Sequence, residues 1–111
     1  MKIYHNPNCT KSRQTLEIIK NKGIEPEVVN YLEVYLEENE ILGLCEALSL
    51  SPIDIIRKKE ALFKELGLET ASEKELISAI KEHPVLLERP IVVSEGRAVI
   101  GRPPENVFEL L

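Results

Sequence analysis

The N-terminal part of the chain restricts the fold most, because an amphipathic stretch lies between two apolar ones. Residues 2–5 are predicted to form a short buried strand, residues 10–22 a helix, and residues 26–32 a second strand. Leu16 and Ile19 are expected to face inward on the helix, and the glycine that follows marks its end. If the two strands share a sheet, they form a right-handed βαβ unit.

The next part of the chain, about residues 38–83, is predicted to be a helical insertion. One apolar face recurs at i, i+3, i+4 and i+7 and consists of Ile41, Leu44, Cys45 and Leu48. Residues 51–54 combine an N-cap serine, a proline and an acidic residue, which predicts a short helix that carries Ile53, Ile56 and Arg57. A further short helix is expected at residues 61–66. A capping box at residues 72–75 predicts a last helix that ends near His83.

The C-terminal part returns to strands. Residues 91–93 and 97–100 flank a short loop with glycine, which is typical of a β-hairpin. Two prolines then open a C-terminal helix expected to carry Val107, Phe108 and Leu111. The order of elements predicts one α/β domain over residues 1–111, with a four-stranded mixed sheet and helices packed on it.

Composition excludes several classes of function. The chain has 111 residues and a net charge of −5, which disfavours nucleic-acid binding through phosphates. No apolar run approaches the roughly 20 residues that span a bilayer, so no membrane association is expected. The N-terminus has no signal-peptide pattern, which predicts a cytoplasmic location. The 2 cysteines and 2 histidines show no metal-ligand spacing and predict neither a metal site nor a disulfide.

Cys9 lies where the predicted first strand gives way, through a polar turn, to the predicted helix. A thiol at the first turn of a helix meets unpaired N–H groups and the positive end of the helix dipole, and both favour the nucleophilic thiolate. The same N–H groups can hold an oxyanion. The alternative is a buried structural thiol, which the polar turn disfavours. The segment therefore indicates a redox or anion-attacking enzyme.

The residue types near Cys9 and elsewhere leave alternatives open. His5 either tunes the thiol or satisfies a backbone group in the strand, and Ser12 either donates to the Cys9 sulfur or satisfies a first-turn N–H. Asn8 either shapes the loop, which is favoured, or helps to bind an anion. The other cysteine, Cys45, is expected to pack in the core rather than to act as a resolving thiol.

Three arginines far apart in the sequence each stand next to a turn or an element end: Arg57, Arg89 and Arg102. By residue type alone, solvated surface charges are the favoured interpretation.

The chain resembles a known family at several ordered motifs. The segment Cys9-Thr10-Lys11-Ser12 fits the C-x-x-S variant of the thioredoxin-like redox motif. The resemblance narrows at Tyr4-His5-Asn6-Pro7-Asn8-Cys9 and at Leu86-Leu87-Glu88-Arg89-Pro90-Ile91-Val92-Val93. It extends to Tyr31-Leu32-Glu33, Ile56-Arg57-Lys58, His83-Pro84 and Gly101-Arg102-Pro103. These segments are similar to those of the arsenate reductases of the ArsC type, which work with glutathione and glutaredoxin.

The resemblance implies a thioredoxin-like fold and a site. Cys9 would be the nucleophile, and the three arginines named above would hold the oxyanion. His5 would tune the thiol, with Asn8 and Ser12 in support, and Pro90 would follow a cis peptide bond. Arsenate would be the substrate, glutathione a co-substrate and glutaredoxin a partner, with no bound cofactor. Convergence of the arginines on Cys9 then becomes the favoured interpretation.

Two other functions are compatible with the same resemblance. Spx-type regulators, which are related to this family, bind RNA polymerase instead of reducing a substrate. They typically carry a C-x-x-C switch, and Ser12 stands here in place of the second cysteine. The other alternative is a glutaredoxin-like protein that handles glutathione mixed disulfides.

Overall fold

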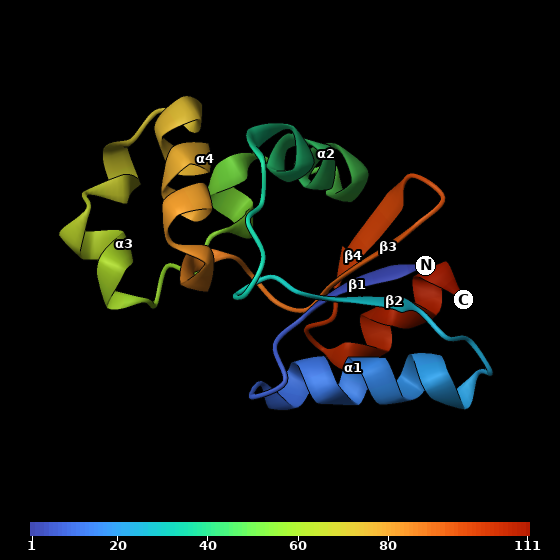
Figure 1. The fold of residues 1–111 in the computed structure, drawn as a ribbon. Coiled ribbons are helices and arrows are strands. Elements are labelled where there is room, and N and C mark those ends of the chain that lie inside the picture. Colours follow the sequence, from blue (N-terminus) through green and yellow to red (C-terminus); the bar gives the residue numbers. More distant parts are fainter. The chain divides into compact units, whose positions relative to one another are not determined.

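The computed structural model describes all of residues 1–111, and its sheet has the predicted α/β arrangement (Figure 1). The four strands are β1 (Lys2–His5), β2 (Glu27–Asn30), β3 (Ile91–Ser94) and β4 (Arg97–Ile100). Their order in the sheet is β2-β1-β3-β4. Strand β1 is parallel to β2 and antiparallel to β3, which in turn is antiparallel to β4. The mixed four-stranded sheet and its parallel βαβ pair are thus confirmed.

Two helical segments complete the part of the chain that carries the sheet. Helix α1 spans Thr10–Asn21, and the 3-10 helix η4 spans Pro104–Leu110. Ile19 of α1 and Val107 of η4 share one fully buried cluster with Ile3 and Val92 of the sheet. Because these residues come from both ends of the sequence, their burial fixes α1 and η4 against the sheet.

The contacts divide the chain into two compact units. Unit 1 comprises residues 1–34 and 89–111, and unit 2 comprises residues 35–88. Unit 2 is helical and contains α2 (Glu38–Leu48), η1 (Pro52–Ile55), α3 (Ala61–Glu65), η2 (Leu68–Thr70), α4 (Glu73–Glu82) and η3 (Pro84–Leu86). The organisation into one domain with an insertion stays a prediction.

The helix starts of unit 2 follow from capping residues that the sequence identifies. Ser72 accepts a hydrogen bond from the Glu75 N–H at 3.2 Å, and Glu75 accepts one from the Ser72 N–H at 3.0 Å. Ser51 and Asp54 form the same reciprocal pair at the start of η1. Each pair satisfies two donors that a helix start leaves unpaired.

Strand β2 and helix η1 end earlier than predicted. Strand β2 ends at Asn30 instead of residue 32, because the Asn30 side chain accepts the Leu32 N–H at 3.1 Å and turns the chain. Helix η1 ends at Ile55, so Ile56 and Arg57 lie outside it. Ile56 instead forms a β-bridge with Leu87, a long-range partner that local sequence does not reveal.

The C-terminal helix also differs from the prediction. It is a 3-10 helix and ends at Leu110, so Leu111 lies outside it. Val107 is buried, whereas Phe108 remains 49% exposed.

The hairpin between β3 and β4 has a two-residue turn at Glu95 and Gly96. Both residues have positive φ angles, of 50° and 78°. This turn suits the right-handed twist of a hairpin, and glycine adopts such angles without steric cost.

None of the helices is long and apolar enough to cross a membrane.

Candidate active site in unit 1

Cys9 is the N-cap residue of α1 and follows directly from the turn after β1. Its N–H donates to the Asn6 carbonyl at 3.0 Å, and its own carbonyl accepts from the Arg13 N–H at 3.0 Å. Its extended backbone, with φ −100° and ψ 121°, is usual for an N-cap. The side chain is partly exposed. The thiol therefore stands at the N-terminal end of the helix and can be reached from solvent.

Asn6 and Arg13 hold the turn before Cys9. The Asn6 side chain accepts the Asn8 N–H at 2.9 Å. Arg13 donates from Nη1 to the Pro7 carbonyl at 2.9 Å and from Nη2 to Thr10 Oγ1 at 3.3 Å. Asn6 belongs to the polar turn that the sequence predicts, because an asparagine before a proline is a turn signal. Arg13 gave no signal, since its role depends on the folded turn.

The environment lowers the pKa of the Cys9 thiol below its ordinary value. Partial burial acts to raise this pKa, but the Ser12 backbone N–H, the Arg89 guanidinium and the Lys11 N–H together outweigh it. These groups stabilise the thiolate as hydrogen-bond donors and, for Arg89, also as a nearby positive charge. The predicted effect of a helix N-terminus on this thiol is therefore present here, reinforced by an arginine.

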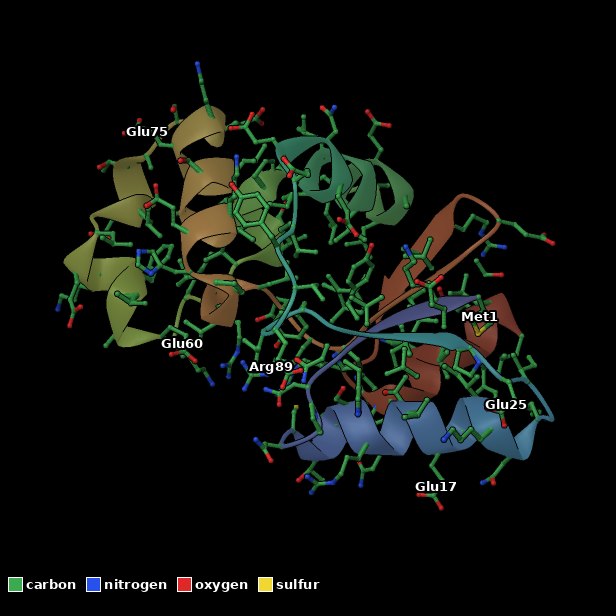
Figure 2. The ribbon with its side chains drawn as sticks, viewed as in Figure 1. Met1, Glu17, Glu25, Glu60, Glu75 and Arg89 are labelled. Carbon is green, nitrogen blue, oxygen red and sulfur yellow. The ribbon has the colours of Figure 1, made fainter.

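Two of the three predicted arginines lie beside Cys9. Arg102 Nη1 is 3.8 Å from Cys9 Sγ and donates to the Arg89 carbonyl at 3.3 Å. The Arg89 Nε–H is buried and has no hydrogen-bond partner. Arg89 is labelled in Figure 2, near the N-terminal end of α1. An unsatisfied buried charged donor is costly unless an anion completes it, so the arrangement suits an anion beside Cys9.

The segments that carry these arginines are tightly held. The Arg89–Pro90 peptide bond is cis, as the resemblance implied, and the Arg102–Pro103 bond is cis as well. Gly101 packs so closely that a Cβ there would lie 2.5 Å from Thr15 Oγ1 and 2.8 Å from Pro90 Cγ. Thr15 lies on the buried side of α1. Gly101 thus allows the Arg102 segment to approach the helix that begins at Cys9.

His5 and Ser12 form a buried hydrogen-bonded pair beneath the turn. His5 Nδ1 is 2.6 Å from Ser12 Oγ, which also accepts the Asn6 N–H at 3.0 Å. Burial, followed by the charges of Arg13 and Lys20, lowers the His5 pKa and keeps the imidazole neutral. The direction of the hydrogen bond between His5 Nδ1 and Ser12 Oγ depends on the tautomer of the imidazole.

The Ser12 hydroxyl neither donates to the Cys9 sulfur nor accepts a first-turn N–H of α1, the two roles expected from the sequence. Its oxygen serves the turn and the histidine, whereas its backbone N–H is the group that acts on the Cys9 sulfur. Asn8 is exposed, and its N–H is bonded within the turn, as loop shaping requires.

Arg57 belongs to unit 2 and makes its contacts with other residues of that unit. Its N–H donates to the Leu86 carbonyl at 2.7 Å, and its guanidinium pairs with Glu60 and lies 4.0 Å from Glu88 Oε1. The side chain is 20% exposed. The expected role of Arg57 in binding an oxyanion stays a prediction.

Cys45 is also in unit 2 and is only 6% exposed, on the buried face of α2, which is the core position expected for it. Burial, with nearby acidic side chains, raises its pKa. No three His, Cys, Asp or Glu side chains are grouped so that they could hold a metal ion.

Comparison with known proteins identifies the family to which this chain belongs. The model of the ArsC family matches residues 4–110. The chain belongs to the ArsC family. An uncharacterised Escherichia coli K12 protein, YfgD, is 49% identical over 100% of this chain and 96% of its own length. A Haemophilus influenzae protein named arsenate reductase is 45% identical over 98% of this chain and 97% of its own length.

A solved structure supports the ArsC-family assignment at the level of the fold. The structure described as an arsenate reductase from Vibrio cholerae is 47% identical and has a TM-score of 0.95, with 100% of this chain and 98% of that chain covered. This similarity confirms the thioredoxin-like fold.

Proposed function

We propose that this ArsC-family protein is a thiol oxidoreductase that reduces arsenate, with Cys9 as the nucleophile. The observation that carries the proposal is the thiol at the start of α1, with its pKa lowered and Arg102 Nη1 at 3.8 Å. Relatives that are 40–45% identical are named arsenate reductase, which supports the choice of oxyanion.

Binding of the oxyanion rests on two kinds of donor. The guanidinium groups of Arg89 and Arg102 can donate paired hydrogen bonds to a tetrahedral anion, and the Arg89 Nε–H has no partner within the protein. The first-turn N–H groups of α1 add donors and the positive end of the helix dipole. Both also stabilise the negative charge that develops as the thiolate attacks.

The first chemical step joins the two reactants. The Cys9 thiolate attacks arsenic, an S–As bond forms, and an As–O bond breaks. The departing oxygen takes up protons and leaves as water. The product is a cysteine–arsenate adduct in which arsenic is still pentavalent.

The second step needs an external thiol. We propose glutathione, whose thiolate attacks the Cys9 sulfur of the adduct. The new S–S bond forms as the S–As bond breaks, and the electron pair of that bond reduces arsenic to the trivalent state of arsenite. The balance is arsenic acid plus two thiols giving arsenous acid, one disulfide and one water. Cys45 is a poor substitute for the external thiol, because it is buried and its pKa is raised.

Glutaredoxin would complete the cycle. One of its thiolates attacks the glutathione sulfur of the mixed disulfide, and Cys9 leaves as the thiolate. A low pKa makes Cys9 a good leaving group in this step.

The test is arsenate turnover with glutathione and glutaredoxin, measured for the wild type, Cys9→Ala and the matched control Cys45→Ala. We expect turnover in the wild type and in Cys45→Ala, and none above background in Cys9→Ala. If the wild type does no better than Cys9→Ala, arsenate reduction is wrong. Activity on a glutathione mixed disulfide with none on arsenate would select the glutaredoxin-like alternative.

A further inference from the structure

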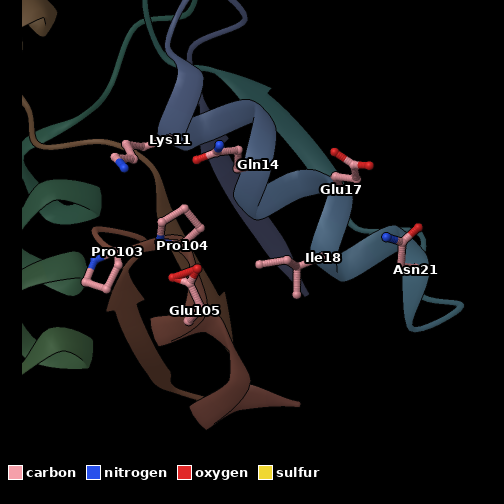
Figure 3. A pocket seen from close by; sticks show the side chains of 8 residues that line it. All are labelled: Lys11, Gln14, Glu17, Ile18, Asn21, Pro103, Pro104 and Glu105. Atoms are coloured by element: carbon pink, nitrogen blue, oxygen red, sulfur yellow. The ribbon is translucent and has the colours of Figure 1, made fainter.

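A groove runs along the exposed side of α1, between this helix and the start of η4 (Figure 3). Its volume is about 410 Å³, within the range of small-molecule sites. One wall comes from α1, and the other comes from the two prolines and Glu105 that begin η4. The α1 wall consists of Lys11, Gln14, Glu17, Ile18 and Asn21. All these residues belong to unit 1.

Both walls begin next to the reactive thiol. Lys11 is two residues after Cys9 on α1, and its backbone N–H helps to lower the Cys9 pKa. Pro103 directly follows Arg102, whose Nη1 is 3.8 Å from Cys9 Sγ. The groove therefore leads away from the place where the proposed second thiol must attack.

The lining offers charges of both signs at different places. Lys11 is the cation at the end nearest Cys9, whereas Glu105 is an anion on the opposite wall. Neither takes part in an ion pair within the protein. The α1 wall also presents the amide of Gln14 and the apolar side chain of Ile18, which Figure 3 shows pointing toward η4. This pattern matches a ligand that carries a carboxylate, an ammonium and a peptide backbone.

The length of the groove suits a short peptide. Its α1 wall extends from Lys11 to Asn21, which is about 15 Å of helix. A fully extended tripeptide spans roughly 10–11 Å. The groove can thus hold the peptide part of a tripeptide thiol while its sulfur stays at the Cys9 end.

We infer that this groove binds the peptide part of the thiol co-substrate, a zwitterionic peptide thiol of the glutathione class. A carboxylate of the peptide pairs with Lys11, and its ammonium pairs with Glu105. This inference rests on the proposed function in one respect, namely that Cys9 reacts with an external thiol.

The experiment measures thiol–disulfide exchange without arsenate. The Cys9 thiolate attacks glutathione disulfide, forming a Cys9–glutathione mixed disulfide and releasing one glutathione thiolate. Bis(2-hydroxyethyl) disulfide gives the same exchange with no charge and no peptide. The second-order rate constants for both are compared in the wild type, Glu105→Gln, and the control Glu25→Gln, whose side chain is exposed beyond the far end of α1 (Figure 2).

The groove predicts a change in the rate with glutathione disulfide that is opposite in sign to the change expected from long-range electrostatics. Glutathione disulfide is an anion, so removing a carboxylate at long range should speed its reaction. The groove instead predicts that Glu105→Gln slows it about twofold to fivefold, the worth of one exposed ion pair. The rate with the neutral disulfide stays unchanged, and Glu25→Gln behaves as the wild type with both. An unchanged or faster reaction of Glu105→Gln with glutathione disulfide overturns the inference, as does an equal change with both disulfides.

A second variant and a binding measurement keep the test independent of one substitution. Lys11→Gln should lower the ratio of the two rate constants by a similar factor, whatever it does to Cys9 itself. S-Methylglutathione, which cannot react, should shift the amide signals of Gln14, Ile18 and Glu105 in a saturable way, and absence of these shifts counts against the groove.

If arsenate turnover fails while the groove effects hold, only the proposed function is wrong. If turnover holds and Glu105→Gln has no effect, only the groove is wrong.

Discussion

The groups around the Cys9 sulfur lower the pKa of the thiol, and the proposed reactivity of Cys9 depends on them. A lowered pKa moves the appearance of thiolate to lower pH, so alkylation of Cys9 should begin at lower pH than for an ordinary cysteine. The rate of iodoacetamide reaction against pH, followed in a Cys45→Ala background, measures this. Arg89→Ala should shift the midpoint upward, because it removes both a hydrogen bond and a positive charge. A wild-type midpoint at or above that of a free cysteine would contradict the anion-site model.

The shape of the Arg89 side chain matters as well as its charge. Arg89→Lys keeps the charge but removes the planar, forked donors that fit a tetrahedral anion. We expect it to lower kcat/KM for arsenate by about tenfold or more, which corresponds to the loss of about 1.4 kcal/mol of transition-state stabilisation. An Arg97→Lys variant, altered at an exposed position of β4, should keep full activity. Equal activity in both variants would show that charge alone is enough.

His5 predicts a pH dependence of stability. Its pKa is lowered in the folded protein, chiefly by burial, from an ordinary value of 6.5. Between the two pKa values the unfolded chain binds more protons, so the free energy of unfolding falls as pH drops below 6.5. His5→Gln lacks this titration and should show a flatter dependence between pH 7 and about pH 5. Urea unfolding at several pH values tests it, and parallel curves for the two proteins would disprove the assignment.

At the scale of elements, the site depends on the close packing of α1 against the segment that follows β4. Gly101→Ala would place a Cβ 2.5 Å from Thr15 Oγ1 and 2.8 Å from Pro90 Cγ. We expect a loss of about 1–3 kcal/mol in the free energy of unfolding, as for other overpacked positions. We also expect lower arsenate turnover, because Arg89 and Arg102 flank the displaced residues.

Gly43 is the matched control for that substitution. It lies in α2, has no atom within 4 Å of an added Cβ, and has no positive φ. Gly43→Ala should therefore stabilise the protein by about 0.5–1 kcal/mol, since alanine favours the helix. Denaturant unfolding of both variants checks the pair. A Gly101→Ala protein as stable as the wild type would mean that the contact relaxes easily.

Elements were predictable where local chemistry determines them. The capping box at Ser72 and the hairpin turn at Gly96 each depend on side chains within a few residues. Predictions failed where a distant partner decides. Ile56 leaves its predicted helix for a bridge with Leu87.

At the scale of the whole molecule, the order of strands and helices was enough to predict a mixed sheet, because a βαβ unit followed by a hairpin allows few arrangements. The arginines of the proposed anion site could not be predicted from the order of elements. By residue type alone, Arg89 and Arg102 are expected to be ordinary surface charges. Only the family resemblance predicted that they lie near Cys9, where the structure places them. The role of Arg13 could not be predicted, because its bonds form only in the folded turn.

In the proposed reaction, Cys9 itself becomes oxidised when arsenate is reduced. The most direct measurement is intact-protein mass spectrometry with peptide mapping, after incubation with arsenate and glutathione but without glutaredoxin. We expect one glutathionyl group, on Cys9, that forms only with arsenate, not with phosphate in its place, and that glutaredoxin removes. A protein that gains no such group, or gains it equally without arsenate, would contradict arsenate reduction through Cys9.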